Sequence, residues 1–289
     1  MLQILSKMKK ALFLLVAVFV AAMFFTTGCT KKSEAVDSVA TDTLVTDTVD
    51  TVKVDSIVEA APMPKAADKL FADFFFDFIS KKKVQMNRIE FPLRMVANGK
   101  TKLVERGQWR MERFYQNQEY YTQIFDNERQ MKAVAKTKAD TVIVEKIHLT
   151  VGRVEQYVFH HPEGKWLLTE VRSSGLKESG NASFLAFLQR FFSDADYQRQ
   201  HVKSPLAYYG PDPNSEDENK YVSMKISALS WSDYLPEIPG DQIYNVVYGK
   251  ADSDSREKIF LFKGIANGLE TQLRFQKQGG QWMLTKLSL

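Results

Sequence analysis

Apolar residues recur at helical spacing in two stretches of the chain. In the first stretch, four phenylalanines stand at positions i, i+3, i+4 and i+7, namely Phe71, Phe74, Phe75 and Phe78. The same spacing returns later in the chain at Phe184, Phe187, Leu188 and Phe191. Residues at these intervals share one face of an α-helix, so each stretch predicts a helix that buries an aromatic face. Asp68 and Ser183 precede the two stretches, and their short polar side chains favour helix N-caps.

After each predicted helix, apolar and polar residues alternate as they do in half-buried strands. Residues 140–150 and 243–248 alternate in this way, and Trp109 and Trp231 open the strand-like region of each part. Both parts end in a hairpin pattern with a glycine turn. The two hairpins match residue by residue, since Phe159, Gly164, Trp166, Leu168 and Thr169 correspond to Phe275, Gly280, Trp282, Leu284 and Thr285.

These matches predict an α+β fold with two tandem domains, residues 68–176 and 177–289, each with N-terminal helices packed on a curved antiparallel sheet. The order of elements in each copy is an aromatic-faced helix, a short second helix ending at Pro92-Leu93 or Pro205-Leu206, and strands that close on a tryptophan hairpin. This order resembles the nuclear-transport-factor-2-like fold.

The phenylalanine-rich helix, with Gln85, Ile89 and Phe91-Pro92-Leu93, is also similar to a family of uncharacterised lipoproteins built from such domains in tandem. The resemblance implies cone-like domains in which helices cross the mouth of a curled sheet and leave room for a small ligand. The candidate pocket residues are Trp109, Tyr121, Trp231 and Tyr244.

The amino terminus has the order of a secretory signal. Three lysines precede the apolar run at residues 11–25, and Thr26-Thr27-Gly28-Cys29 follows it. The last four residues resemble the lipobox of bacterial lipoproteins, although Thr26 replaces the usual aliphatic residue. The resemblance implies that residues 1–28 are removed and that Cys29 carries lipid. The alternative, a membrane-spanning helix, needs about 20 apolar residues, which is longer than this run.

Residues 29–67 form a predicted linker rich in threonine, aspartate and valine, with no aromatic residue. The tripeptide aspartate, hydroxyl residue, aliphatic residue occurs there five times. It resembles an O-glycosylation sequon of exported proteins from Gram-negative anaerobes, which implies sugars on Ser38, Thr43, Thr48, Thr51 and Ser56. Two alternatives are open: a segment of this composition generates such triplets by itself, and the valine alternation could form an edge strand.

The sequence offers little catalytic chemistry. Its single cysteine stands at the predicted cleavage site, so no internal disulfide and no catalytic thiol are expected. The formal net charge of +4 comes without a basic run that contains aromatic residues, which argues against nucleic acid as a partner. The four histidines have no partner at metal or triad spacing. We therefore expect no cofactor, metal or catalytic residues, and the acidic loop at residues 212–218 is the weak alternative for a metal.

These features predict a lipoprotein of the cell envelope that acts as a non-enzymatic binding or interaction module. The expected location is the outer membrane facing the periplasm, with the cell surface as the alternative. The membrane, through the lipid anchor, is the expected partner, together with an envelope protein, a glycan or a small apolar ligand. A lyase or isomerase acting on an apolar molecule in one cone is the rival hypothesis, and a structural spacer is a third. The enzyme hypothesis requires an acid or histidine that meets tyrosine in a pocket.

Overall fold

The computed structural model describes residues 70–289 apart from 116–117, 136–137, 218, 236–239, 250–254 and 266–267. The predicted signal, Cys29, the linker with its five candidate glycosylation sites, and Asp68 lie outside the described residues. The described residues belong to one compact unit. The predicted boundary between residues 176 and 177 lies within this unit, and the division into two domains stays a prediction.

The chain runs twice through a similar order of elements. The first run contains the helices α2 (Phe71–Ser80), α3 (Lys82–Asn87) and α4 (Glu128–Val134), the strands β1 (Ile89–Ala97), β2 (Lys100–Val104), β3 (Tyr120–Phe125), β4 (Thr141–His148), β5 (Arg153–His160) and β6 (Leu167–Gly175), and the short 3-10 helices Arg106–Gln108, Pro162–Gly164 and Leu176–Glu178. The second run contains the helices α5 (Ala182–Ser193) and α6 (Ala195–Gln200), the strands β7 (Val202–Pro211), β8 (Tyr221–Ile226), β9 (Gln242–Tyr248), β10 (Glu257–Gly264), β11 (Glu270–Gln278) and β12 (Gln281–Ser288), and the 3-10 helix Trp231–Tyr234.

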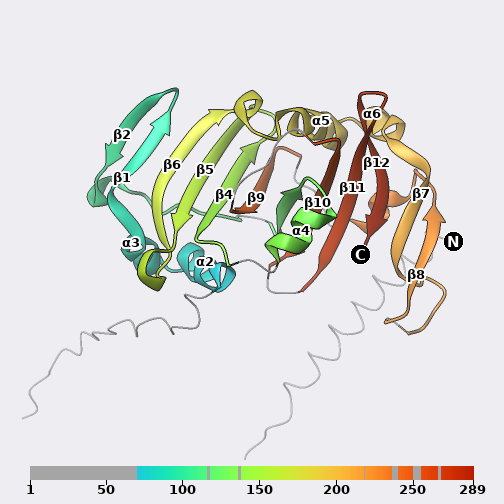
Figure 1. The fold of residues 1–289 in the computed structure, drawn as a ribbon, viewed down its shortest axis with the longest axis horizontal. Coiled ribbons are helices and arrows are strands. Elements are labelled where there is room, and N and C mark those ends of the chain that lie inside the picture. The colour runs from blue at the N-terminus through green and yellow to red at the C-terminus, as the bar shows by residue number, and fades with distance from the viewer. Residues whose placement is uncertain are drawn as a thin grey trace, which may run out of the picture. The chain divides into compact units, whose positions relative to one another are not determined.

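All twelve described strands belong to one sheet, in the order β2-β1-β6-β5-β4-β9-β3-β10-β11-β12-β7-β8. Figure 1 shows them side by side from β2 at one edge to β8 at the other. Read inward from either edge, the order is a hairpin, then three strands, then one strand contributed by the other half of the chain. The predicted α+β composition with a curved sheet is confirmed, although the sheet is large and the helices are few.

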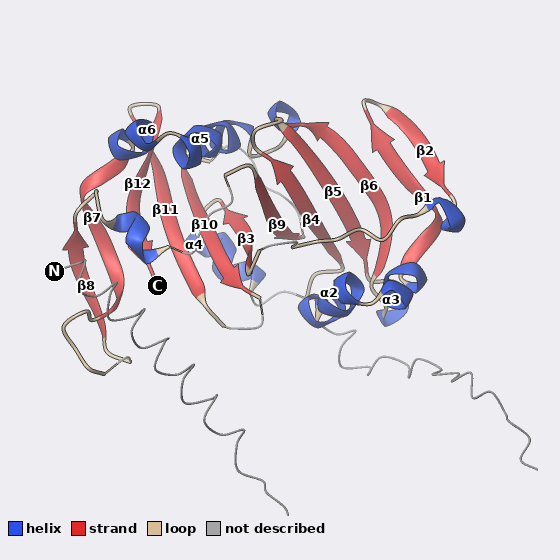
Figure 2. Cartoon of the chain, turned by 180° about the vertical axis from the view of Figure 1, so that it is seen from behind, coloured by secondary structure: helices blue, strands red, loops and turns tan. Residues whose placement is uncertain are grey.

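Each of the two central strands, β3 and β9, pairs with a strand from the other half of the chain, and we call them the exchanged strands. Strand β9 pairs with β4 of the first half, whereas β3 pairs with β10 of the second half. The two strands meet in the middle of the sheet, where Thr122 pairs with Asn245 (Figure 2). The Thr122 hydroxyl also donates to the Tyr244 carbonyl at 3.0 Å. Each half of the sheet is therefore completed by a strand from the other half.

Two aromatic cores support the sheet. In the first, Phe71, Phe74, Phe75 and Phe78 of α2 surround Phe159 of β5 with ring centroids 5.2 to 5.9 Å away. In the second, Phe184, Phe187 and Phe191 of α5 surround Phe275 of β11 at 5.3 to 5.5 Å. Both predicted helix faces are confirmed, because these rings are buried in their helices, together with Leu188 in α5. The predicted hairpins β5–β6 and β11–β12 are confirmed as well.

A glutamine closes the end of each aromatic helix, fully buried in the first half and half-buried in the second. The amide nitrogen of Gln85 donates to the Phe78 and Glu112 carbonyls at 3.2 and 3.0 Å. Its oxygen accepts from Trp109 Nε1 at 3.1 Å and from the Glu112 amide at 2.8 Å. In the second half, Gln198 repeats the first contact, donating to the Phe191 carbonyl at 3.0 Å. Gln85 uses its full hydrogen-bonding capacity, which explains why a polar side chain tolerates complete burial.

Three local predictions are wrong. The N-cap of α5 is Asn181, whereas Ser183 lies inside the helix. Pro92 and Pro205 lie within β1 and β7 and do not end a second helix. Each proline stands where its strand shifts register against the parallel neighbour, since proline has no N–H to give to the ladder. Trp109 and Trp231 flank or begin 3-10 helices and open no strand.

Candidate functional site

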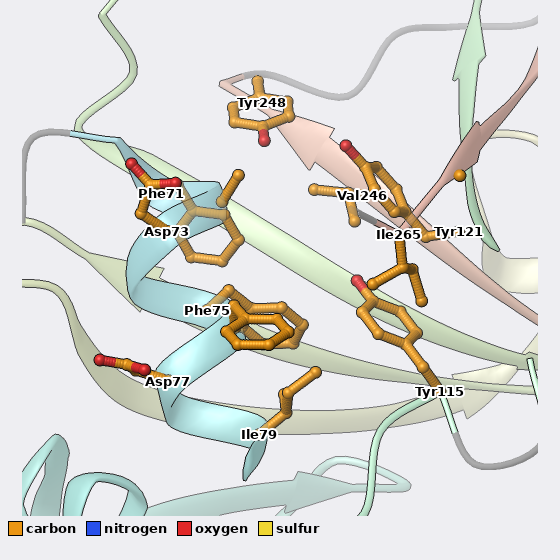
Figure 3. Close-up of a pocket in the computed structure, with 13 residues that line it drawn as sticks. Phe71, Asp73, Phe75, Asp77, Ile79, Tyr115, Tyr121, Val246, Tyr248 and Ile265 are labelled. Carbon is orange, nitrogen blue, oxygen red and sulfur yellow. The ribbon is translucent and has the colours of Figure 1, made fainter. Parts of the chain in front are cut away.

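The candidate site is a cavity of about 620 Å³ between α2 and the central strands. Its walls come from both halves of the chain, because α2 and the turn before β3 face β9 and the end of β10 (Figure 3). The lining residues are Phe71, Ala72, Asp73, Phe75, Phe76, Asp77, Ile79, Tyr115, Tyr121, Val246, Tyr248, Gly264 and Ile265. The walls are thus mainly apolar and aromatic, with three tyrosines and two aspartates as the polar side chains.

Local structure explains why these side chains face the cavity. Phe71 and Phe75 are one helical turn apart on α2, and their rings stack with centroids 5.3 Å apart. Val246 and Tyr248 are two positions apart on β9 and therefore share a face of the sheet. Tyr121 reaches the same cavity from β3, the exchanged strand of the first half.

Tyr115 lies in the turn before β3 with φ at +54°, in the left-handed region that L-residues avoid. Its ring packs against Phe75 at 5.7 Å, Tyr121 at 6.0 Å and Tyr244 at 5.1 Å. These three rings hold the side chain against the cavity wall. A backbone conformation of this kind costs roughly 1–2 kcal/mol, and such costs are concentrated at functional sites.

Three tyrosine hydroxyls point toward the space between helix and sheet, from Tyr115, Tyr121 and Tyr248 (Figure 3). Burial raises the pKa of the Tyr115 hydroxyl well above its usual range, and the nearby hydroxyls of Tyr121 and Tyr248 raise it further. Burial also raises the pKa of Tyr121 and of Tyr248. The three groups therefore stay protonated at neutral pH, where each can donate one hydrogen bond and accept others.

The carboxylates beside this cavity do not face the tyrosines. Asp73 and Asp77 belong to α2, and their carboxylates point away from the tyrosine hydroxyls (Figure 3). Asp77 forms an ion pair with Lys81 at 2.7 Å. Glu145 is a buried acid of β4 and lies on the face of that strand opposite Val144, which packs in the α2 core. Burial raises the pKa of Glu145. Hydrogen bonds from Gln156 and Asn245 lower the pKa by a smaller amount.

A family model described as a domain of unknown function, DUF4348, matches residues 50–289. The chain belongs to the DUF4348 family. The chain is also similar to the crystal structure of an ntf2-like protein from Bacteroides fragilis NCTC 9343, with 30% identity and a TM-score of 0.71. That similarity covers 78% of this chain and 98% of the other. The predicted resemblance to the nuclear-transport-factor-2-like fold is thereby confirmed. None of the curated proteins compared with this chain matches it.

In this DUF4348 chain, only one of the four candidate pocket residues, Tyr121, lies among the residues that line the cavity. Trp109 instead binds Gln85. Tyr244 is buried behind the cavity wall, where its hydroxyl donates to the Arg113 carbonyl at 3.3 Å and burial raises its pKa to about 12. Trp231 packs on Phe191 in the second core, with ring centroids 5.3 Å apart.

The sequence analysis missed Tyr115 and Tyr248. The alternation of Tyr244, Val246 and Tyr248 on β9 was a usable signal, because residues two apart in a strand share a face. Tyr115 gave no such signal, because it lies in an irregular turn.

The described part of this DUF4348 chain contains no group of three histidine, cysteine or acidic residues placed to hold a metal. In the acidic loop at residues 212–218, the weak alternative for a metal, Asp212 forms an ion pair with Lys220 at 2.9 Å. None of the helices in the described residues is long and apolar enough to cross a membrane.

Proposed function

We propose that this chain is a lipid-anchored protein of the cell envelope that binds a small apolar molecule in the cavity beside α2 without converting it. One observation carries the proposal: an aromatic cavity into which three protonated tyrosine hydroxyls point, while the two carboxylates in its wall point away. Its volume of about 620 Å³ falls in the range of small-molecule sites. Apolar walls with a few polar groups are typical of such sites, since the polar groups fix the orientation of the ligand.

The state of the tyrosines favours binding over catalysis. A lyase or isomerase needs a group that takes up a proton near neutral pH, such as a histidine or a carboxylate aimed at the substrate. Tyrosines with raised pKa values are too weakly acidic to be ionised, so they serve as neutral hydrogen-bond donors. Within the described residues, no histidine lines the cavity. The rival enzyme hypothesis therefore gains no support from this site.

We further propose that the sheet consists of two nuclear-transport-factor-2-like copies that have exchanged their central strands. The matched positions of Phe159 and Phe275, and of Gln85 and Gln198, support this description. The exchange explains why the cavity takes walls from both halves: β9 stands beside β4, and Tyr121 of β3 lies within reach of Tyr248.

Blocking the cavity mouth tests the proposed function. Ala72 is an exposed residue of α2 that lines the cavity, so Ala72→Trp places an indole at the opening and leaves the aromatic core intact. Apolar ligands that raise the melting temperature of the parent protein are expected to lose at least tenfold in affinity for this variant, as judged by thermal shift and calorimetry. A tenfold loss corresponds to about 1.4 kcal/mol.

The matched control is Ala186→Trp, an exposed alanine on α5 of the second half. This variant is expected to bind as the parent protein does. Equal binding by Ala72→Trp and the parent, or absence of any apolar ligand that shifts the parent, would refute the cavity as the binding site.

The anchor and the stalk are proposed from the sequence. We propose that lipid on Cys29 holds the protein to the outer membrane on its periplasmic side, with sugars on the five linker residues. Two or more acyl chains anchor stably, because each buried methylene contributes about 0.8 kcal/mol. Cys29→Ala is therefore expected to move the protein from the membrane fraction to the soluble fraction. Retention of the variant in the membrane fraction would contradict the anchor, and a mature mass without added sugar would contradict glycosylation.

A further inference from the structure

A second cavity, of about 390 Å³, adjoins the first. Tyr121 and Tyr248 line both, so these two side chains form the shared wall. The second cavity differs in character, because its remaining walls include Gln123, Lys132, Lys263 and Glu270 beside apolar residues of β3, β10 and α4. An apolar space and a polar space thus meet at two tyrosines.

Strand register places a lysine at this junction. Lys263 of β10 is the cross-strand partner of Tyr121, and on its other side it is the partner of Glu270. Directly paired residues have adjacent side chains on the same face of the sheet. Burial raises the pKa of Tyr121, and the nearby charge of Lys263 lowers it by a smaller amount. The Lys263 ammonium therefore lies beside the tyrosine wall that the two cavities share.

The charges favour an anion at this end of the site. The second cavity is lined by Lys132, Lys263 and Glu270, whereas Asp73 and Asp77 stand at the opposite, α2 end of the first cavity. Lys132 forms an exposed ion pair with Glu128 at 2.6 Å, and Lys263 is the lysine beside the shared tyrosines. Lys263 is paired with Glu270 at 3.2 Å, but both side chains are more than a third exposed. An ion pair of this kind contributes little, roughly 0.2–1 kcal/mol, so the lysine can exchange its partner for a ligand at small cost.

We infer that the ligand is a single-chain amphiphile with an anionic carboxylate head, whose tail fills the cavity beside α2 and whose head lies at Lys263, Tyr121 and Tyr248. The inference rests on the proposed function and specifies its ligand class. The tail contacts the aromatic face of α2, and its burial supplies the affinity. The head accepts hydrogen bonds from the ammonium and the two hydroxyls, which supply the orientation and the preference for an anion.

The test compares three probes with the same ten-carbon tail: decanoate, 1-decanol and decyltrimethylammonium. The protein is the chain with Cys29→Ala, which lacks acyl chains that could occupy the cavity. We expect calorimetry to show decanoate binding about tenfold more tightly than decanol, because hydrogen bonds to charged groups are the stronger ones. Decyltrimethylammonium is expected to bind more weakly than decanol.

Lys263→Met is expected to abolish the tenfold preference for decanoate while the affinity for decanol stays unchanged. The control is Lys102→Met, which removes an equal charge from exposed β2 at the far edge of the sheet and is expected to keep the preference. Equal binding of decanoate and decanol by the parent, or an unchanged preference in Lys263→Met, would overturn the inference and leave the apolar site standing. If none of the three probes binds, the proposed function fails as well.

Discussion

Replacing Phe159 with alanine is expected to lower the free energy of unfolding by about 3–5 kcal/mol. The ring of Phe159 is fully buried, and four phenylalanines of α2 contact it from one side of the sheet. Truncation removes the transfer free energy of the ring and leaves a cavity that these rigid neighbours cannot fill. The loss is expected to appear in urea or guanidinium denaturation, followed by far-UV circular dichroism and tryptophan fluorescence.

The same experiment reports on how the two halves are coupled. Because β3 and β9 are exchanged, loss of the first core removes the support for a strand that borders the second half. Phe159→Ala is therefore expected to shift one common transition, as is Phe275→Ala in the other core. Phe76→Ala, at a ring that is 54% exposed, is the control and is expected to cost less than about 1 kcal/mol. A denaturation curve with two steps, of which only one moves, would contradict the coupling.

Asp126→Ala is expected to destabilise the protein by a similar amount, about 3–5 kcal/mol, for an electrostatic reason. Lys258 of β10 is almost fully buried, and its ammonium donates to Asp126, just after β3, and to the Asn181 side chain at 2.7 Å. Removal of the Asp126 carboxylate takes a charged acceptor away from a buried ammonium, which is a costly loss. The free energy of unfolding of the variant, measured by chemical denaturation, tests this.

A second substitution separates this effect from simple loss of packing. In the Asp126→Ala background, Lys258→Met removes the buried charge, and it is expected to restore most of the lost stability, because an apolar side chain needs no counter-ion. Lys81→Ala serves as the control, since it breaks the ion pair with Asp77 at a lysine that is 60% exposed. That change is expected to cost under about 1 kcal/mol. A double variant no more stable than Asp126→Ala would argue against the electrostatic explanation.

Sequence pattern predicted the parts of the fold that depend on neighbours in the chain. The phenylalanine spacing specified the buried faces of α2 and α5, because helical periodicity relates residues only a few positions apart. The hairpins β5–β6 and β11–β12 followed from alternation around glycine turns. The exchange of β3 and β9 was not predictable in this way, because alternation states which face of a strand is buried and says nothing about which strand lies beside it.

The candidate site was predictable to the same limited extent. Tyr121 was among the candidate pocket residues, and it lines the cavity from β3. Tyr115 faces the cavity because its turn adopts a left-handed conformation, which no pattern of apolar residues encodes. The junction at Lys263 depends on the register of β10 against β3, which are more than a hundred residues apart in the chain.

The exchanged strands also determine when the sheet can form during synthesis of the chain. Strand β4 pairs with β9 through residues such as Glu145 and Asn245, which are 100 positions apart. While the chain is being made, the first half has no neighbour for that side of β4 until residues 242–248 have emerged. Its open edge is a template for pairing with other chains, and contacts of such long range form slowly. A chain with this topology can complete the sheet of its first half only after β9, at residues 242–248, has been made.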